Sequence, residues 1–486
     1  MADRTTKIIG KQKKYDSLLA IAFTFFILAI PFQTRIFLAD LGHGLEGNEY
    51  SSAWLWGTDI LLAAVAFLII ARQSFYPAEV TQEFKKSLSE VIVEIFLLGF
   101  LITIVTSLAF AANKHIAAWT FIKFLELFIL FFIPRFLKPD VLFKVLAVGM
   151  GLGAIAQSLI ALLQFKFQSD LGLRLLGESP LGMLINGVAK MHVAGATVIR
   201  VYGTTPHPNV LAAYLAVAVL IINALLLNYL KDNRDNKRAI LIKIIFGSFL
   251  LLSFFALALS GSRAVWVGLL AGETIFFGFL IAKYFHAGIV EKAKITIRPR
   301  SDVLRMIIFT ISVNAVAAVL VLLALFPFIV PRVSVAREEQ AVGFRLFYNQ
   351  TAIELIEAKP LVGVGPGDFV ENIGQPTPRF KLKDWVYQPA HNIYLLIAAE
   401  NGLISLFIFI CLVLSVFYRT ASKIKNLSWQ NNNFVLAAGI SLGLILFVGF
   451  FDHFSWTLQQ GRLLFWLLLG ILASHGLKDK RFGEPS

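Results

Sequence analysis

The chain has 486 residues, of which 57% are hydrophobic and 15% are charged, and its formal net charge is +14. Soluble globular domains carry about 25% charged residues, so the composition excludes an ordinary soluble protein. The positive charges lie in short segments between apolar stretches, which argues against nucleic-acid binding and favours contacts with membrane lipids. The single cysteine, Cys411, excludes a disulfide within one chain.

Apolar stretches recur along the whole chain. A helix of about 20 apolar residues crosses a hydrocarbon core of about 30 Å. On this basis we expect an all-α polytopic membrane protein with about twelve transmembrane helices, forming a single integral membrane domain over residues 1–486. The predicted spans are residues 17–34, 54–71, 89–112, 117–134, 141–165, 207–228, 240–259, 264–283, 306–330, 393–418, 433–451 and 461–475.

Basic residues mark alternate connections between these spans. The N-terminal tail and the loops at 229–243 and 283–305 are rich in Lys and Arg. Basic loops stay on the cytoplasmic side of a membrane. This pattern predicts that both termini are cytoplasmic in the cytoplasmic membrane.

Two of the loops predicted to face outward are long, at residues 166–206 and 331–391. Loops longer than about 15 residues are usually functional or disordered. The second loop contains a helix-like stretch, Gly343 to Glu357, and then a turn rich in glycine and proline, Gly363 to Gly367. We expect short helices in this loop.

Polar residues gather in five places at the predicted outer face. These clusters are Arg200 to Asn209, Ser260 to Trp266, the surroundings of Arg345, His391 to Glu400, and Asp452 to Arg462, which includes His453. The planar guanidinium of arginine binds phosphate oxygens. Histidine is the side chain that accepts a proton near neutral pH. Together these residue types predict a reaction in which arginines bind a lipid-linked diphosphate leaving group while a histidine deprotonates an attacking hydroxyl.

Metal chemistry has little support in the sequence. No HExxH motif and no DxD pair occurs in a predicted outer loop, although Asp40, Glu46 and Glu49 in the first outer loop are a weak hint of a metal site. Cationic side chains can take the place of a metal ion at a diphosphate. We therefore expect a reaction without metal or cofactor.

The pattern resembles the O-antigen ligase and polymerase superfamily of bacterial membrane glycan transferases. The resemblance covers residues 200–475 well and the first five spans only by topology, and 207–475 is the core that it predicts. Four loose motifs carry it by their order and spacing: Gly203-Thr-Thr-Pro-His-Pro-Asn-Val-Leu-Ala-Ala-Tyr214, Ser260-Gly-Ser-Arg-Ala-Val-Trp266, Pro360-Leu-Val-Gly-Val-Gly-Pro-Gly367 and His391-Asn-Ile-Tyr-Leu-Leu-Ile-Ala-Ala-Glu-Asn-Gly402.

The resemblance implies a GT-C-like helical membrane fold that acts in cell-envelope polysaccharide biosynthesis, of which lipopolysaccharide is one product. It implies transfer of a glycan from an undecaprenyl-diphosphate-linked donor to a hydroxyl-bearing glycan, lipid or protein acceptor on the periplasmic side. By motif, His391 is the general base, and Arg200 and Arg263 hold the diphosphate. Arg345 also lies in a context similar to the family. Supporting roles are predicted for Asn392, Glu400, His453 and Arg462.

Each of these residues also fits a structural role. Arginines at span ends, such as Arg200 and Arg263, often contact lipid headgroups. His391 would also fit as the start of a helix beside Asn392, a good N-cap residue. His207 precedes Pro208, which is typical of a helix start. His453 is the rival base, and Glu400 would either orient His391 or pair with another polar group. Trp385 and Tyr387 would stack on sugars or lie in the membrane interface.

A transporter or flippase of lipid-linked glycan is the alternative function. Charged residues inside spans can line a pathway, and Lys123, Glu126 and Glu273 lie in predicted spans. Lys123 and Glu126 are three residues apart, however, which suits an internal ion pair. A membrane scaffold would explain the topology but not the outer arginines and histidines. The sequence leaves ligase, polymerase and protein O-glycosyltransferase open.

Overall fold

The computed structural model describes residues 2–42, 48–75, 88–193, 196–232, 237–291, 301–333, 340–373, 387–424 and 429–474. Within these ranges nine helices are long and apolar enough to cross a membrane. All nine coincide with predicted spans. Three further helices occupy the other predicted spans: α1 (Ala2–Ala29), α13 (Trp429–Val448) and α15 (Gln459–Ser474). The chain is therefore an all-α polytopic membrane protein, as its sequence predicts.

Backbone contacts divide the chain into two compact units. Unit 1 comprises Met1–Val145, Ala336–Asn426 and Gly449–Ser486. Unit 2 comprises Leu146–Val335 and Leu427–Val448. The two units interleave along the sequence, so each is built from segments that are far apart in the chain.

Unit 1 holds the first four spans and the last part of the chain. Besides α1 and α15, its elements are β1 (Arg35–Asp40), β2 (Ser52–Trp56), α2 (Gly57–Phe75), α3 (Leu88–Phe110), α4 (Lys114–Phe132), η2 (Ile133–Phe136), the start of α5 (Pro139–Phe167), α11 (Gln340–Ala358), η4 (Val370–Asn372), α12 (Ile393–Ile424) and α14 (Phe454–Thr457).

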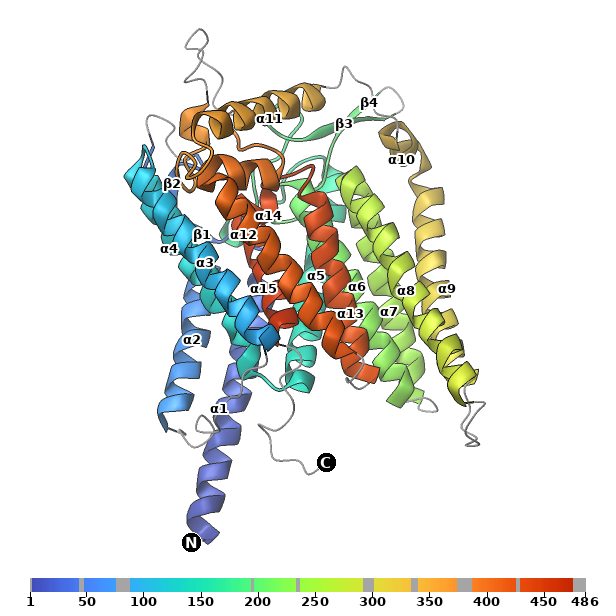
Figure 1. The fold of residues 1–486 in the computed structure, drawn as a ribbon. Helices are drawn as coiled ribbons and strands as arrows, with labels where there is room; N and C mark the ends of the chain where they lie inside the picture. Colours follow the sequence, from blue (N-terminus) through green and yellow to red (C-terminus); the bar gives the residue numbers. More distant parts are fainter. Residues whose placement is uncertain are drawn as a thin grey trace. The chain divides into compact units, whose positions relative to one another are not determined.

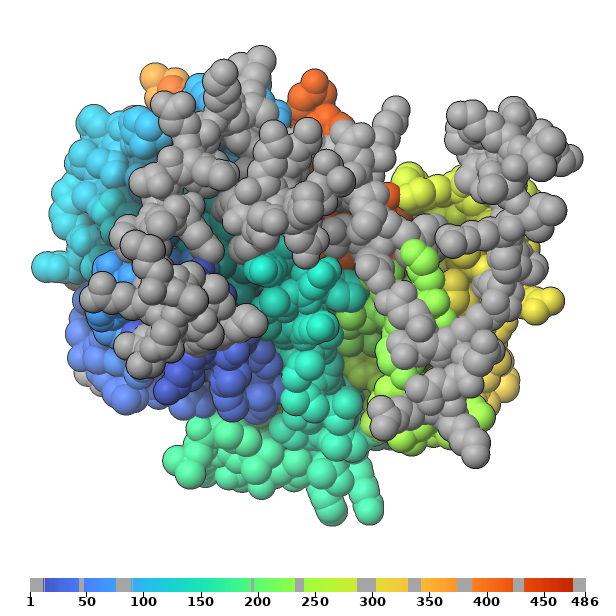
Figure 2. Space-filling model, turned by 90° about the horizontal axis from the view of Figure 1, so that it is seen from below, coloured from blue at the N-terminus to red at the C-terminus, as the bar shows by residue number. Residues whose placement is uncertain are grey.

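Long helices pack against each other in unit 1. The first two, α1 and α2, lie side by side and are blue in Figures 1 and 2. The helix α12 packs against α3, α11 and α15, and α15 also packs against α4 (Figure 1). The outward faces of these helices keep large apolar side chains exposed, such as Ile95 and Phe407. Exposed apolar side chains on spanning helices suit a lipid environment.

A short antiparallel hairpin, β1 and β2, precedes α2. Its register pairs Arg35 with Trp56 and Asp40 with Ser52. Side chains two residues apart in a strand share a face, so Ser52, Trp54 and Trp56 point the same way. This hairpin was not predicted from the sequence, because two strands of five or six residues give little periodic signal.

Unit 2 contains the remaining helices and a second hairpin. Its elements are the rest of α5, η3 (Arg174–Leu176), β3 (Lys190–Val193), β4 (Ala196–Ile199), α6 (Pro208–Asp232), α7 (Lys237–Ser260), α8 (Arg263–Glu291), α9 (Ser301–Ala324), α10 (Phe326–Val333) and α13. The helix α6 forms the core of unit 2, because 89% of the residues in its most apolar 18-residue stretch are buried. It packs against α7, α8, α9 and α13.

The predicted outer loops have defined structure where they are described. The first, residues 166–206, contains η3 and the hairpin β3–β4, which was not predicted. The second contains α11, which confirms the helical stretch predicted at Gly343 to Glu357. The span predicted at 306–330 is divided differently, because α9 ends at Ala324 and α10 begins at Phe326. Glu46 and Trp385 lie outside the described residues.

Candidate active site

His391 lies two residues before the start of α12 in unit 1. The side chain of Asn392 caps this helix: its Oδ1 accepts hydrogen bonds from the backbone N–H groups of Tyr394 at 2.9 Å and Leu395 at 3.1 Å. Such a cap satisfies backbone donors that have no partner within the helix. The predicted capping role of Asn392 is confirmed, and it fixes the backbone that carries His391.

The hydrogen bonding of His391 defines its tautomer. Its Nδ1 lies 3.2 Å from the backbone oxygen of Pro389. A carbonyl oxygen only accepts hydrogen bonds, so Nδ1 must carry the hydrogen in this contact. In the neutral imidazole the lone pair is then on Nε2. His391 is thus arranged to accept a proton at Nε2.

Two rings contact the His391 imidazole, and a third ring contacts its neighbour His453. Tyr348 of α11 stacks on His391, with ring centroids 5.4 Å apart and planes 12° apart. His453 meets His391 edge-on at 4.7 Å, and Tyr50 meets His453 edge-on at 5.6 Å. These four residues form what we call the histidine cluster. They come from four separate stretches of unit 1, so only the tertiary structure brings them together.

His453, the rival base, has a similar tautomer. The hydroxyl of Thr457 donates to the backbone oxygen of His453 at 3.2 Å. Its oxygen therefore accepts from Nδ1–H of His453, at 2.6 Å. Asp452 accepts from the backbone N–H groups of His453 at 2.8 Å and Phe454 at 3.2 Å, which fixes the turn before α14.

The surroundings keep His391 neutral. Burial lowers the pKa of its imidazole below the usual 6.5, and the positive charge of Arg345 lowers it further, while the negative charge of Asp452 raises it. Loss of solvation penalises the charged imidazolium. Burial also raises the pKa values of the Tyr50 and Tyr348 hydroxyls, so both stay protonated. Arg345 therefore acts on the predicted base through its charge, while its predicted role as a diphosphate ligand stays a prediction.

Glu400 is placed by an unusual backbone arrangement. The helix α12 breaks at Gly402, whose φ of 88° and ψ of 164° are not helical. The turn after α11 docks on this break: Val364 N–H donates to Ala399 O at 2.9 Å, and Leu403 N–H donates to Pro360 O at 2.8 Å. This break lies inside the span predicted at 393–418.

Glycine is required on both sides of that docking. A Cβ at Gly363 would overlap the backbone of Glu400, and a Cβ at Gly402 would overlap the backbone oxygen of Leu361. Both glycines have positive φ, which other residues rarely adopt. The close approach places the buried Glu400 carboxylate near the backbone of Gly367 and Phe369 and near the Trp456 side chain.

A buried charge cluster lies beside these residues in unit 1. Lys123 binds the carboxylate of Glu126 at 3.1 Å, which confirms the predicted pair, and it also binds Asp59. Asp59 in turn accepts from Gln459 at 2.8 Å, and Arg462 donates to Gln459 at 3.3 Å. Asp59 was not singled out from the sequence, although an acidic residue inside a predicted span is itself a signal.

The two arginines predicted to hold the diphosphate lie in unit 2, at one turn. Arg200 Nε donates to the backbone oxygen of Ser260, the last residue of α7, and its Nη2 donates to Asn209 at 2.7 Å. Arg263 is the first residue of α8, three positions after Ser260, and is partly exposed. The predicted pair is thus assembled around the α7–α8 turn, with Arg200 stabilising the carboxyl end of α7.

The motif from Gly203 to Tyr214 is held by glutamines of α5. Gln164 accepts from the backbone of Gly203 at 2.9 Å, and Gln157 accepts from that of Thr204 at 2.8 Å. The helix α6 begins at Pro208, and His207 Nδ1 accepts from Asn209 N–H at 3.2 Å. This confirms the helix-start interpretation of His207.

The predicted site residues thus fall into two groups. His391, Asn392, Arg345, Glu400, His453 and Arg462 belong to unit 1, and Arg200 and Arg263 belong to unit 2. The structure adds Tyr348 and Tyr50 to the first group, and neither was singled out from the sequence. Tyr348 lies three residues after Arg345 on α11 and therefore near the same helix face, a signal that is present in the sequence. In the described part of the chain, no group of three or more His, Cys, Asp or Glu side chains could hold a metal ion.

Comparison with known proteins gives one family. No curated protein matches the chain significantly. The family model described as O-antigen ligase matches residues 248–410, a stretch that contains Arg263, Arg345, His391 and Glu400. Such a match points to a membrane enzyme of the glycosyltransferase or ligase type. Through this region the chain is similar to the O-antigen ligase family, which confirms the resemblance to the O-antigen ligase and polymerase superfamily.

Proposed function

We propose that this protein transfers a glycan from an undecaprenyl-diphosphate-linked donor to a hydroxyl acceptor at the outer face of the bacterial cytoplasmic membrane. The observation that carries the proposal is the state of His391. Its Nδ1–H is held by the Pro389 carbonyl, its pKa is lowered, and it lies within the region similar to O-antigen ligases.

In the proposed reaction His391 acts as general base. Its Nε2 takes the proton of the acceptor hydroxyl as the hydroxyl oxygen forms a bond to the anomeric carbon of the donor glycan. The bond from that carbon to the diphosphate oxygen breaks, and its electron pair leaves with undecaprenyl diphosphate. Arg200 and Arg263 are proposed to neutralise the charge that develops on this leaving group, which is where arginine is most effective.

The test is release of undecaprenyl diphosphate by the purified protein in detergent, given lipid-linked glycan and candidate acceptors that include the donor itself. His391→Ala should lower the rate by about 100-fold or more, as expected for loss of a general base. His115→Ala is the matched control, because His115 is an exposed histidine of unit 1. Full activity of His391→Ala would exclude His391 as the base, and loss of activity in His453→Ala but not in His391→Ala would assign the base to His453.

Two further readouts come from the same assay. The size of the glycan product separates a polymerase, which extends the donor glycan, from a ligase, which moves it to another acceptor. A chelator should leave the rate unchanged, because the proposed charge neutralisation uses arginines. Loss of activity in chelator that a divalent ion restores would contradict a metal-independent reaction.

Transport of lipid-linked glycan is the second candidate. The break of α12 at Gly402 favours it, because discontinuous helices are common at transporter substrate sites. The pairing of Lys123 with two carboxylates favours a structural role for that charge instead. Translocation of lipid-linked glycan in liposomes without any transfer would support the transporter.

A further inference from the structure

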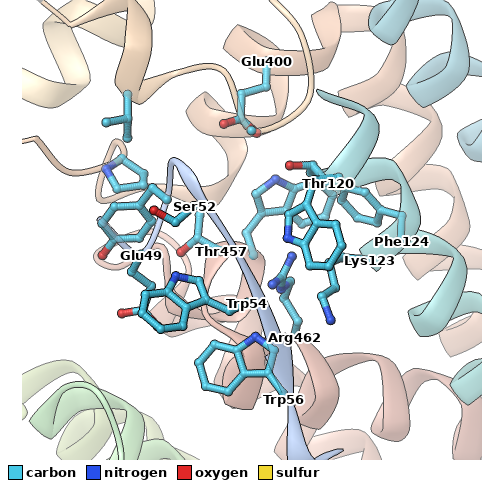
Figure 3. A pocket seen from close by; sticks show the side chains of 16 residues that line it. Glu49, Ser52, Trp54, Trp56, Thr120, Lys123, Phe124, Glu400, Thr457 and Arg462 are labelled. Carbon is cyan, nitrogen blue, oxygen red and sulfur yellow. The ribbon is translucent and has the colours of Figure 1, made fainter. Parts of the chain in front are cut away.

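Unit 1 contains a cavity to which the proposed transfer mechanism assigns no role. Its volume is about 680 Å³, including space open to solvent. Its lining includes carboxylates, cationic groups and four tryptophans (Figure 3). The tryptophans are Trp54, Trp56, Trp119 and Trp456. Pockets with aromatic walls and a few polar groups are typical small-ligand sites.

The cavity adjoins the histidine cluster. Pro389, whose carbonyl holds His391, lines it, and so does Thr457, whose hydroxyl holds His453. Tyr50 lines it as well and contacts the His453 ring. A molecule bound in the cavity would therefore lie next to the proposed base.

The tryptophan walls are held in place by the protein. The guanidinium of Arg35 lies over the rings of Trp54 and Trp56, 4.1 and 4.8 Å from their centroids, and it forms an ion pair with Glu49 at 2.9 Å. Trp456 is buried and packs at 5.1 Å from the ring of Phe124. Rigid aromatic faces provide apolar contact area at low entropic cost.

Several hydrogen-bond donors belong to residues that line the cavity. Within the described part of the chain, Ser52 Oγ, Trp54 Nε1 and Arg462 Nε are buried and make no hydrogen bond. All three residues line the cavity. Buried donors in native proteins are nearly always paired with protein, water or ligand, so three such groups around one cavity would be satisfied by a ligand rich in oxygen atoms.

Acceptors are present on the same cavity. The carboxylates of Glu49 and Glu400 line it, and Lys123 and Arg462 line it as well. Figure 3 shows Glu400 on the opposite side of the cavity from Trp56 and Arg462. This combination of flat apolar faces, donors and acceptors suits a ring that carries several hydroxyls.

We infer that this cavity binds one pyranose ring of a glycan substrate, with the tryptophans against its C–H faces and Trp54, Ser52, Arg462 and Glu400 hydrogen-bonded to its hydroxyls. The inference rests on the proposed function. The bound ring is the sugar of the substrate that lies next to the reacting hydroxyl. A polyprenyl chain would fill the aromatic walls but would leave the three donors unpaired, so the same groups select sugar over lipid.

Binding is tested with the purified full-length protein by tryptophan fluorescence titration. Four of its eight tryptophans line the cavity, so a bound ligand should change the emission. The probes are methyl pyranosides of a hexose, an N-acetylhexosamine and a hexuronic acid, the disaccharides of each, and farnesol. The variants are Trp54→Phe and Trp466→Phe. Both remove a buried indole N–H without a partner in the described structure, but only Trp54 lines the cavity.

A sugar should bind the wild type, and Trp54→Phe should weaken its affinity about fivefold to tenfold, as for loss of one buried hydrogen bond. Trp466→Phe should bind within about twofold of the wild type. Lack of binding by every saccharide, an equal effect of both variants, or quenching by farnesol that depends on Trp54 would overturn the inference.

The transfer assay identifies which substrate carries the bound sugar. Trp54→Phe should raise KM for either the acceptor or the lipid-linked donor while kcat is kept. His391→Ala should bind the sugar as the wild type does. If sugar binds but release does not need His391, the proposed mechanism fails and the sugar site stands. If release needs His391 but no sugar binds, the sugar site alone fails.

Discussion

The buried charge cluster makes a sharp prediction about Lys123. Its ammonium is buried and lies 3.1 Å from Glu126 and in contact with Asp59. The substitution Lys123→Met keeps an unbranched side chain of nearly the same length and removes the charge, which leaves two carboxylates without their cation. The Asp59 side chain is only 7% exposed, compared with 24% for Glu126, so Asp59 is the more deeply buried of the two carboxylates.

The size of the effect follows from the geometry. With an effective dielectric constant of about 20, Coulomb's law gives about 5 kcal/mol for unit charges 3.1 Å apart. Removal of one partner of a buried ion pair typically costs about 3–5 kcal/mol, because a charge is left uncompensated. We therefore expect Lys123→Met to lower the free energy of unfolding by about 3 kcal/mol or more.

The assay is reversible unfolding in mixed micelles, followed by circular dichroism. The double variant Lys123→Met with Asp59→Asn is the decisive comparison. The neutral amide that replaces the carboxylate can still accept a hydrogen bond from the Trp56 backbone N–H, which bonds to Asp59 at 2.9 Å in the wild type. The double variant should therefore recover a large part of the loss. A single variant as stable as the wild type, or a double variant no better than the single, would refute the reasoning.

Two further predictions concern the base and the backbone. Because the pKa of His391 is lowered and only the neutral imidazole acts as base, kcat/KM should fall as pH decreases through a value below 6.5. Arg345→Ala should move this limb to higher pH and Asp452→Asn to lower pH; a limb that stays fixed in both would contradict the assignment. Gly402→Ala should cost about 2 kcal/mol or more, because φ is 88° and a Cβ would overlap a backbone oxygen, whereas Gly443→Ala has open space and should not destabilise. Equal unfolding midpoints of these two variants would count against the required break.

The helices were predictable because their signal is local. A span is recognised by about 20 consecutive apolar residues, and no distant contact is needed to find it. All nine apolar spanning helices found in the described ranges could therefore be located from hydropathy. The helix start at Pro208, the cap at Asn392 and the ion pair of Lys123 with Glu126 are also short-range features. The residues of the motifs were sufficient to indicate the similarity to O-antigen ligases.

The sites were less predictable because their contacts join distant segments. Asp59 meets Lys123 across 64 positions in the sequence, and nothing near either residue specifies the other. Tyr348 reaches His391 only because α11 packs on α12. The docking of the Gly363 turn on the break at Gly402 depends on two backbones approaching so closely that neither tolerates a Cβ.

Sequence alone therefore determined which segments cross the membrane and which polar residues are candidates for the chemistry. The tertiary structure decided which of them meet. It assembled the histidine cluster, locked the tautomer of His391 through a backbone carbonyl, and gathered four tryptophans from three segments around one cavity. The physical reason is that hydropathy and capping act within a few residues, whereas a binding site is formed by packing between helices that are far apart in the chain.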